Sequence, residues 1–182
     1  GGQGIVLLGI IIAEAAIIEG MNVAQTQSYG PEARGGSSKS EVVISDEEID
    51  YPKAQRLDCL LAMSQKSCDD YFSDLKPEGI LIVDSTYVKQ TPLQKAYKIP
   101  FTRIAKEKLK ADYVANIVAL GAFSVFTPFL KKGSLKDALL SRVPKGTEKL
   151  NILAFEEGVR EGTKAKRTSK PLLISERIDE DT

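Results

Sequence analysis

The sequence has no histidine and no tryptophan, and only two of its 182 residues are cysteines, Cys59 and Cys68. The absence of histidine removes the usual general base near neutral pH and the commonest metal ligand. Two cysteines are too few for a zinc or iron–sulfur site, which needs about four ligands. We therefore predict that the chain binds no metal or cluster by itself and that both thiols are reduced and mostly buried, as in cytoplasmic proteins.

An excess of charge of either sign is also absent, since 25 Lys and Arg residues balance 25 Asp and Glu residues. This balance argues against a nucleic-acid partner bound by neutralising phosphates. No signal peptide is visible. The longest apolar run, residues 5–18, contains Glu14 and is shorter than the ~20 residues of a membrane helix. A single soluble, cytoplasmic domain without a membrane partner is the expectation.

The apolar pattern predicts an α/β fold with strands and helices in alternation. A helix over residues 5–18 is apolar nearly all round, so we expect cover on more than one side, and Gly20 marks its end. The expected strands are Val23–Gln27, Glu41–Ser45, Leu57–Met63, Ile80–Val83 and Ile99–Ile104. A helix capped by Ser64 is expected from Gln65 to about Lys76, where Pro77 and Gly79 would stop it. This order predicts three αβα layers around a mostly parallel, doubly wound sheet.

The second half of the chain is predicted to be helical. Val114 to Val125 has apolar residues at helical spacing, Ser134 is expected to begin another helix, and Thr147 to cap a third. We predict one domain over residues 1–163 and a polar, extended or disordered arm over residues 164–182. The usual first strand of such a sheet would lie upstream of Gly1.

The first candidate site is the loop Gly-Gly-Gln-Gly at residues 1–4. Glycines let a backbone approach a ligand closely, and the start of the helix that follows offers free N–H groups to an anion. The spacing matches neither a dinucleotide-binding fingerprint nor a P-loop. A purely structural tight turn therefore stays open as an alternative.

The second candidate site is the loop over residues 28–38, Ser-Tyr-Gly-Pro-Glu-Ala-Arg-Gly-Gly-Ser-Ser. Arg34 lies between two glycine turns, with Ser37 and Ser38 close behind, and a guanidinium beside hydroxyl groups suits a phosphate. The alternative is a solvated loop with an incidental arginine. Both loops are expected at the carboxyl edge of the sheet, where ligands bind in open α/β folds.

Together, the two loops resemble the gamma subunit of 2-oxoacid:ferredoxin oxidoreductases. The run Asn-Ile-Val-Ala-Leu-Gly-Ala at residues 116–122 is similar too, and the likeness covers roughly residues 1–160. The form of the second loop is most like the 2-oxoglutarate branch. Pyruvate and branched-chain members carry related loops and remain alternatives.

The resemblance implies one subunit of an enzyme that decarboxylates a 2-oxoacid on thiamine diphosphate. Electrons then pass through iron–sulfur clusters to ferredoxin, and the acyl group passes to coenzyme A. Thiamine diphosphate, Mg and [4Fe-4S] clusters are expected on partner subunits. The expected partners are alpha and beta subunits, with a delta subunit as a further candidate. The present chain would contribute to the coenzyme A site and to assembly, without activity of its own.

The resemblance also implies roles for single residues, none of them catalytic and none a metal ligand. Those expected to bind coenzyme A are Gly2, Gln3, Gly4, Ile5, Arg34, Ser37, Ser38 and Asn116. Those expected at the partner interface are Tyr29, Pro31, Glu32, Gly35 and Gly36. Two hypotheses of other classes stay open: a stand-alone nucleotide- or phosphate-binding module, and a purely structural subunit.

Overall fold

The structure, a computed structural model, describes residues 2–31, 36–92 and 96–169. Its main elements are α1 (Ile5–Ile18), β1 (Asn22–Tyr29), β2 (Ser38–Ser45), β3 (Leu57–Ala62), α2 (Gln65–Tyr71), β4 (Leu75–Asp84), β5 (Tyr97–Ile99), α3 (Phe101–Arg103), α4 (Ala115–Phe126), α5 (Lys132–Arg142) and α6 (Glu148–Thr168). Short helical turns join some of them, η1 (Phe72–Asp74), η2 (Ile104–Lys108) and η3 (Asp112–Val114).

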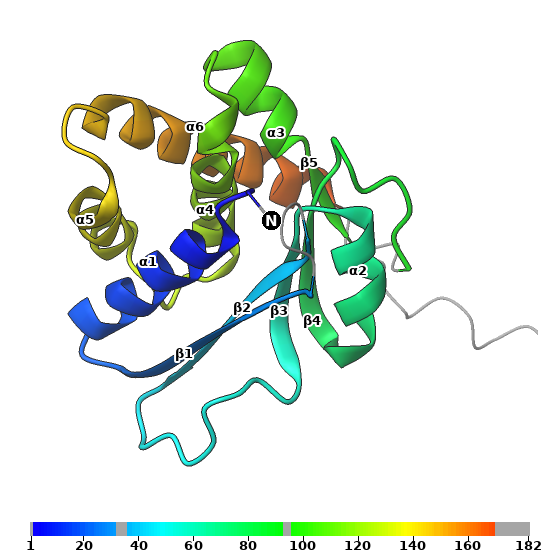
Figure 1. Cartoon of the computed structure of the whole chain (residues 1–182), viewed down its shortest axis with the longest axis vertical. Coiled ribbons are helices and arrows are strands. Elements are labelled where there is room, and N and C mark those ends of the chain that lie inside the picture. Colours follow the sequence, from blue (N-terminus) through cyan, green and yellow to red (C-terminus); the bar gives the residue numbers. More distant parts are fainter. Residues whose placement is uncertain (1, 32–35, 93–95, 170–182) are drawn as a thin grey trace, which may run out of the picture.

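Three parallel strands, in the order β3–β4–β5, form the central layer (Figure 1). The side chains of β4 alternate between two cores. Leu81 and Val83 face the smaller core beneath α2, whereas Ile82 faces the larger core beneath α1, α4 and α6. Helices therefore cover both faces of the sheet, which confirms the predicted α/β class and its three layers.

Strands β1 and β2 form an antiparallel pair separate from the central sheet. Both were expected as strands, but not in this pairing. The Gly30 N–H donates to the Ser37 carbonyl at 2.7 Å, which closes a short connection between them. A short connection permits only an antiparallel return, because a parallel one needs a crossover of a dozen or more residues.

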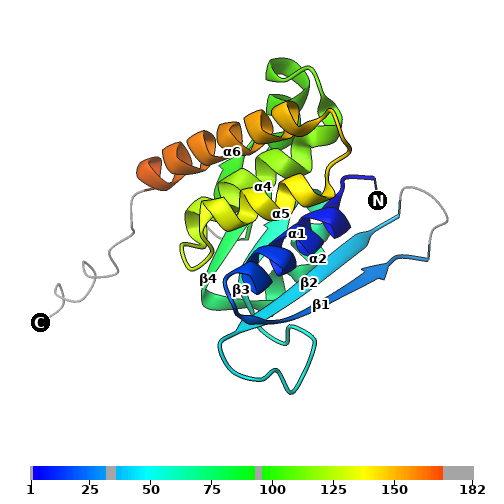
Figure 2. The same cartoon turned by 90° about the vertical axis from the view of Figure 1, so that its left-hand side faces the viewer.

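Helix α1 has the predicted bounds and is covered on two sides. The β1–β2 hairpin lies along one side and α5 along another (Figure 2). Its end is fixed at Gly20, whose φ of +79° suits the left-handed position after a helix. The Met21 N–H then donates to the Ala16 carbonyl at 3.0 Å, so the chain reverses directly into β1.

Two predicted boundaries in the middle of the chain are wrong. The strand expected over residues 99–104 ends at Ile99, and Phe101 begins a helical turn. The helix expected to reach Lys76 ends at Tyr71, and β4 begins at Leu75. Pro77 is tolerated in β4 because the pairing with β3 is irregular there and demands no ladder N–H from it.

The predicted helix caps differ in their outcomes. Ser64 caps α2, since its hydroxyl accepts from the Ser67 N–H at 3.2 Å. Ser134 caps nothing, because α5 begins at Lys132 and the Ser134 hydroxyl donates to Glu19 instead. Tertiary contact with α1 thus outweighs the local capping pattern.

The start of the last helix is predicted correctly, but its cap is not. Thr147 precedes α6, yet its hydroxyl donates to the Pro144 carbonyl at 2.7 Å. The helix continues to Thr168, so the segment expected as an arm from Lys164 begins inside α6. Residues 170–182 of that arm lie outside the described residues, and the domain boundary at 163 stays a prediction.

Helices α4 and α6 pack so closely that their backbones touch. A Cβ added to Gly121 would lie 2.0 Å from the Phe155 carbonyl oxygen, and one added to Gly158 would lie 1.9 Å from that of Val118. Every described residue of α4 except Val125 is buried. This helix pair forms the rigid support of the molecule.

Both cysteines are free thiols, as predicted. Cys68 is a buried residue of α2, and Cys59 is half-buried on β3. Desolvation of its thiol raises the pKa of Cys59 to about 12, and burial also raises the pKa of Cys68. Neither thiol is ionised near neutral pH, so neither acts as a nucleophile there.

Candidate functional site

The loop before α1 lies at the carboxyl end of the central sheet. The Gln3 side chain donates from Nε2 to the Met63 carbonyl at 3.1 Å, directly after β3. Ile5 then begins α1, and the first turn of this helix has no side-chain cap and no acidic residue. Its first N–H groups therefore remain available to a ligand at the sheet edge.

Position 4 accepts only glycine without strain. Its φ is +71°, a left-handed conformation that side chains disfavour. An added Cβ would also lie 2.3 Å from Nδ2 of Asn116. The glycine expected to let a ligand approach thus first lets the Asn116 side chain approach.

Asn116 carries the most unusual polar atom in the described part of the chain. The residue lies in the first turn of α4 and is only 4% exposed. Its Nδ2 donates to the Gly4 carbonyl at 3.2 Å, which fixes the orientation of the amide. Its Oδ1 is buried and has no hydrogen-bond partner. Buried acceptors are normally satisfied, and leaving one unpaired costs about 1–3 kcal/mol.

The second predicted loop is the open end of the β1–β2 hairpin. Residues 32–35 of this loop, which include the predicted Glu32, Arg34 and Gly35, lie outside the described residues. Tyr29 and Pro31 are exposed there, whereas Gly36 is half-buried. A cavity of about 150 Å³ lies at this end, lined by Ser28, Tyr29, Gly30, Ser37, Ser38, Lys39 and Tyr71.

The chain reversal at Gly20 brings the two loops together. Because β1 runs back along α1, the end of β1 at Tyr29 returns towards the start of α1. Figures 1 and 2 both place the start of α1 and the open end of the hairpin on the same side of the molecule. The arrangement offers free helix N–H groups, an unpaired amide oxygen and hydroxyl groups to one extended polar ligand.

Sequence reasoning missed a buried carboxylate at this edge, Asp84 at the end of β4. Its Oδ1 accepts from the Thr86 N–H at 3.0 Å, and its Oδ2 accepts from the Thr102 N–H at 3.2 Å and from the Thr102 hydroxyl. These bonds order the turn after β4 and the start of α3. An acidic residue directly after a continuous apolar run was the available signal.

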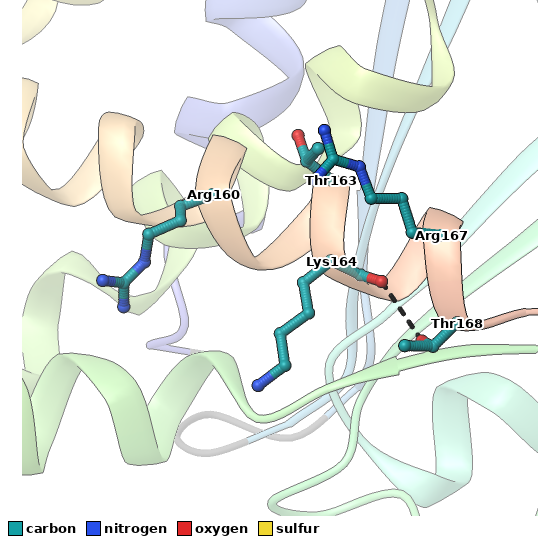
Figure 3. Close-up of a pocket in the computed structure, with 5 residues that line it drawn as sticks. All are labelled: Arg160, Thr163, Lys164, Arg167 and Thr168. Carbon is teal, nitrogen blue, oxygen red and sulfur yellow. Dashed lines mark hydrogen bonds between the residues drawn. The ribbon is translucent and has the colours of Figure 1, made fainter.

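A second hollow of about 410 Å³ lies away from the loops, along the last turns of α6 (Figure 3). Arg160, Thr163, Lys164, Arg167 and Thr168 line it, all from this one helix. Figure 2 shows the end of α6 on the opposite side of the molecule from the start of α1. This basic surface therefore does not belong to the site at the sheet edge.

The described residues contain neither a candidate metal site nor a candidate membrane span. No group of three His, Cys, Asp or Glu side chains in residues 2–31, 36–92 and 96–169 could hold a metal ion. No helix in these ranges is both long enough and apolar enough to cross a membrane.

Comparison with known proteins identifies the family. Residues 1–161 match the family described as pyruvate ferredoxin/flavodoxin oxidoreductase. The 2-oxoglutarate synthase subunit KorC of Methanocaldococcus jannaschii is 51% identical over 163 residues, which cover 87% of each chain.

Two solved structures agree with this match. The gamma subunit of a keto/oxoacid ferredoxin oxidoreductase from Geobacter sulfurreducens superposes with a TM-score of 0.79 at 44% identity, over 90% of this chain and 94% of that one. A 2-oxoglutarate:ferredoxin oxidoreductase from Magnetococcus marinus, solved with 2-oxoglutarate, coenzyme A and succinyl-CoA bound, has a TM-score of 0.79 at 25% identity. It is matched over 90% of this chain and 30% of its own. The resemblance inferred from the two loops is confirmed, including its likeness to the 2-oxoglutarate branch.

Proposed function

This chain belongs to the pyruvate ferredoxin/flavodoxin oxidoreductase family as a gamma subunit, and we propose that it forms the coenzyme A side of a 2-oxoglutarate:ferredoxin oxidoreductase. The complex converts 2-oxoglutarate, coenzyme A and oxidised ferredoxin into succinyl-CoA, carbon dioxide and reduced ferredoxin. The 51% identity to a 2-oxoglutarate synthase subunit supports this substrate over pyruvate or a branched-chain 2-oxoacid.

The unpaired Oδ1 of Asn116 carries the proposal for coenzyme A. A buried acceptor beside a glycine loop costs stability in the isolated chain, so a ligand donor that completes it is a physical reason for its presence. Coenzyme A has amide N–H groups along its pantetheine arm and phosphates at its other end. An amide N–H of the pantetheine arm could donate to the Asn116 Oδ1. The free N–H groups of α1 could donate to a carbonyl or phosphate oxygen of the ligand.

Within this proposal the residues take the roles that the sequence suggested. The backbone of residues 2–5 contacts the pantetheine or diphosphate, Asn116 hydrogen-bonds the ligand, and Arg34 with Ser37 and Ser38 holds phosphate. The residues assigned to the interface with partner subunits are Tyr29, Pro31, Glu32, Gly35 and Gly36. The exposed ring of Tyr29 supports that assignment, because aromatic side chains are enriched at protein interfaces.

We assign the remaining cofactors and the electron acceptor to other chains. Two cysteines and no histidine make too small a donor set for an iron–sulfur cluster, which needs about four ligands. By its resemblance to the family, we place thiamine diphosphate, Mg and the [4Fe-4S] clusters on partner subunits. These partners would be alpha, beta and, as a further candidate, delta subunits, and ferredoxin would dock on the complex. We also propose a cytoplasmic location, on the basis of the two free thiols.

Anaerobic affinity purification of the tagged chain from its native cells tests the assembly. We expect co-purifying subunits with iron–sulfur absorbance and with dye reduction that depends on coenzyme A. Rates with 2-oxoglutarate, pyruvate and branched-chain 2-oxoacids then identify the substrate. A lone, colourless protein would instead favour a stand-alone phosphate-binding module. A complex whose activity does not depend on the two loops of this chain would favour a structural subunit.

The variant Arg34→Ala tests the coenzyme A site within that complex. Loss of one charge-assisted contact to phosphate is worth about 1.5–3 kcal/mol, so KM for coenzyme A should rise by roughly ten- to a hundred-fold. Decarboxylation of bound 2-oxoacid should be retained, because it precedes acyl transfer. An unchanged KM would remove Arg34 from the site.

A further inference from the structure

In the described part of the chain, the hollow at the end of α6 is lined by one helix alone (Figure 3). The lining residues fall at positions i, i+3, i+4, i+7 and i+8, so they share one side of α6. We call this side the α6 basic face: Arg160, Thr163, Lys164, Arg167 and Thr168. The opposite side of the helix packs on α4, where a Cβ added to Gly162 would lie 2.9 Å from the Cα of Ala122. The α6 basic face therefore points away from the core.

The shape of this hollow suits a broad partner surface better than a small ligand. Sites for small molecules are concave and bury most of the surface of the ligand. A single helix cannot enclose a ligand in this way, because it supplies a wall on one side only. The remaining walls of such a site have to come from another molecule.

The charges of α6 are separated along the helix. All of its carboxylates lie before residue 162, whereas the charged residues after that point are Lys164, Lys166 and Arg167. Arg160 is paired with carboxylates of its own helix. Within residues 2–31, 36–92 and 96–169, no carboxylate pairs with Lys164 or Arg167. These two residues therefore leave the α6 basic face with positive charge to offer.

The helix dipole accounts for only part of this pattern. The carboxyl end of a helix favours cations, but the effect falls off within the last turn. Lys166 lies in that turn and reaches back to α4, where its Nζ donates to the Val125 carbonyl at 3.3 Å. Lys164 lies before the last turn and lines the hollow together with Arg167. The dipole does not explain why these two cations share one exposed face.

The chemistry of the face favours an acidic protein as its partner. Guanidinium and ammonium groups beside hydroxyl groups bind carboxylates or phosphates. A nucleic-acid partner is normally bound by a strongly basic domain or an extended basic stripe. The present chain instead has equal numbers of basic and acidic residues, and the unpaired cations of this face occupy a single helix turn. Carboxylates on a protein surface therefore suit the face better than a nucleic acid.

We propose that the α6 basic face docks an acidic surface of another subunit of the oxidoreductase complex, with Lys164 and Arg167 as the contacting cations. The docking rests on the proposed function only in that this chain works within a complex, and it needs no role in binding coenzyme A. The family match ends at residue 161, before both cations, so the contact lies beyond what that match covers.

Two further observations support a resident partner at this end of α6. Figure 2 shows the end of α6 on the opposite side of the molecule from the start of α1, so a docked subunit leaves the glycine loop open. In the Magnetococcus relative, the matched part is 30% of a longer chain and is thus covalently joined to the rest. A separate chain has to be held by noncovalent contacts instead.

Zero-length crosslinking of the purified complex tests this docking directly. A carbodiimide joins an amine to a carboxylate only where the two are in contact. Peptide mapping should find Lys164 joined to an Asp or Glu of another subunit, and added salt should weaken the crosslink because it screens exposed charges. No crosslink, or one confined to this chain and its own acidic residues 179–181, would overturn the proposal. A Lys164 that becomes open to acetylation only after nuclease treatment would assign the face to nucleic acid, with the same consequence.

The paired variant Lys164→Gln/Arg167→Gln measures what the contact contributes. It should raise the dissociation constant of this chain from the complex by roughly three- to thirty-fold, because two exposed ion pairs are lost. Glutamine keeps the helix propensity, so the urea midpoint of the free chain should stay unchanged. Lys149→Gln, at an exposed position in the first turn of α6, is the matched control and should leave the dissociation constant unchanged.

The design separates this docking from the proposed coenzyme A site. If the paired variant dissociates as the wild type does while Asn116→Ala raises KM for coenzyme A, the docking is wrong and the coenzyme A site stands. If the paired variant weakens assembly while Asn116→Ala and Arg34→Ala leave KM unchanged, the docking stands and the coenzyme A site fails.

Discussion

The helix pair α4–α6 and the edge formed by the two loops differ in how closely their groups are packed and in whether their polar atoms are paired. Between α4 and α6 the backbones touch at Gly121 and Gly158, and nearly every side chain of α4 is buried. At the edge, Gly4 has a positive φ, and Asn116 keeps a buried acceptor without a partner. The first region is packed for stability, and we propose that the second uses its unpaired polar groups to bind a ligand.

The largest loss of stability should come from a substitution in the contact between α4 and α6. Gly158→Ala places a methyl group against the Val118 carbonyl oxygen, where only backbone could move aside. We expect a loss of about 3 kcal/mol or more in the free energy of unfolding. Gly133→Ala is the matched control, because nothing lies within 4 Å of its added Cβ in α5. It should stabilise the chain by roughly 0.5–1 kcal/mol. Urea denaturation measures the free energy of unfolding of both variants. Equal values for the two would refute the close backbone contact at Gly158.

A smaller effect on stability, but a larger one on function, is expected at Asn116. Asn116→Ala loses the bond to Gly4 and also removes the unpaired acceptor, so the net change in unfolding free energy should stay below about 1 kcal/mol. Asn151 is similarly buried, but its Nδ2 donates to the Thr147 carbonyl at 3.0 Å. Asn151→Ala should therefore cost about 1–2 kcal/mol.

The functional half of this comparison is KM for coenzyme A in the assembled complex. Asn116→Ala should raise it by roughly tenfold or more, whereas Asn151→Ala should leave it unchanged. If the two variants lose stability equally and neither alters KM, Asn116 contributes to stability alone and not to ligand binding.

The smallest effect concerns pH and the ion pair that ties α1 to α5. A hydrogen bond from Arg142 lowers the pKa of Glu14 below its ordinary value of 4.5, against the opposing effect of burial. A lowered pKa contributes stability above pH 4.5, and that contribution is lost as pH falls through the folded value. Glu14→Gln should thus differ most from the wild type near neutral pH, and the difference should shrink in acid.

Urea midpoints between pH 3 and pH 7 check this prediction, with Arg142→Gln and the double variant completing the cycle. The double variant should behave as either single variant does. A difference between Glu14→Gln and the wild type that grows as pH falls below 4.5 would contradict the sign.

The sequence predicted those features that depend on local pattern. The apolar run of α1, its end at Gly20 and the Ser64 cap follow from neighbouring residues, and so did the two loops. The pairing of β1 with β2 was not predicted, because apolar alternation identifies a strand but not its partner. Strand β5 was placed too far along the chain, because bonds from Thr102 to the distant Asp84 begin α3 there.

The finer parts of the site depend on three-dimensional contacts that no pattern carries. Asn116 was predicted as a ligand residue, but its unpaired oxygen depends on how Gly4 orients the amide. The contact between Lys39 and the Tyr71 ring was not predicted, because the two residues lie on different elements that only the folded chain brings together.

Photoaffinity labelling of the anaerobic complex with a coenzyme A analogue is the most direct test of the central claim, that this chain forms the coenzyme A site. Peptide mapping should find the label in this chain, in the peptides that contain residues 2–5, 28–39 or 116, and an excess of coenzyme A should abolish it. Label confined to the other subunits, and competed by coenzyme A there, would contradict the claim.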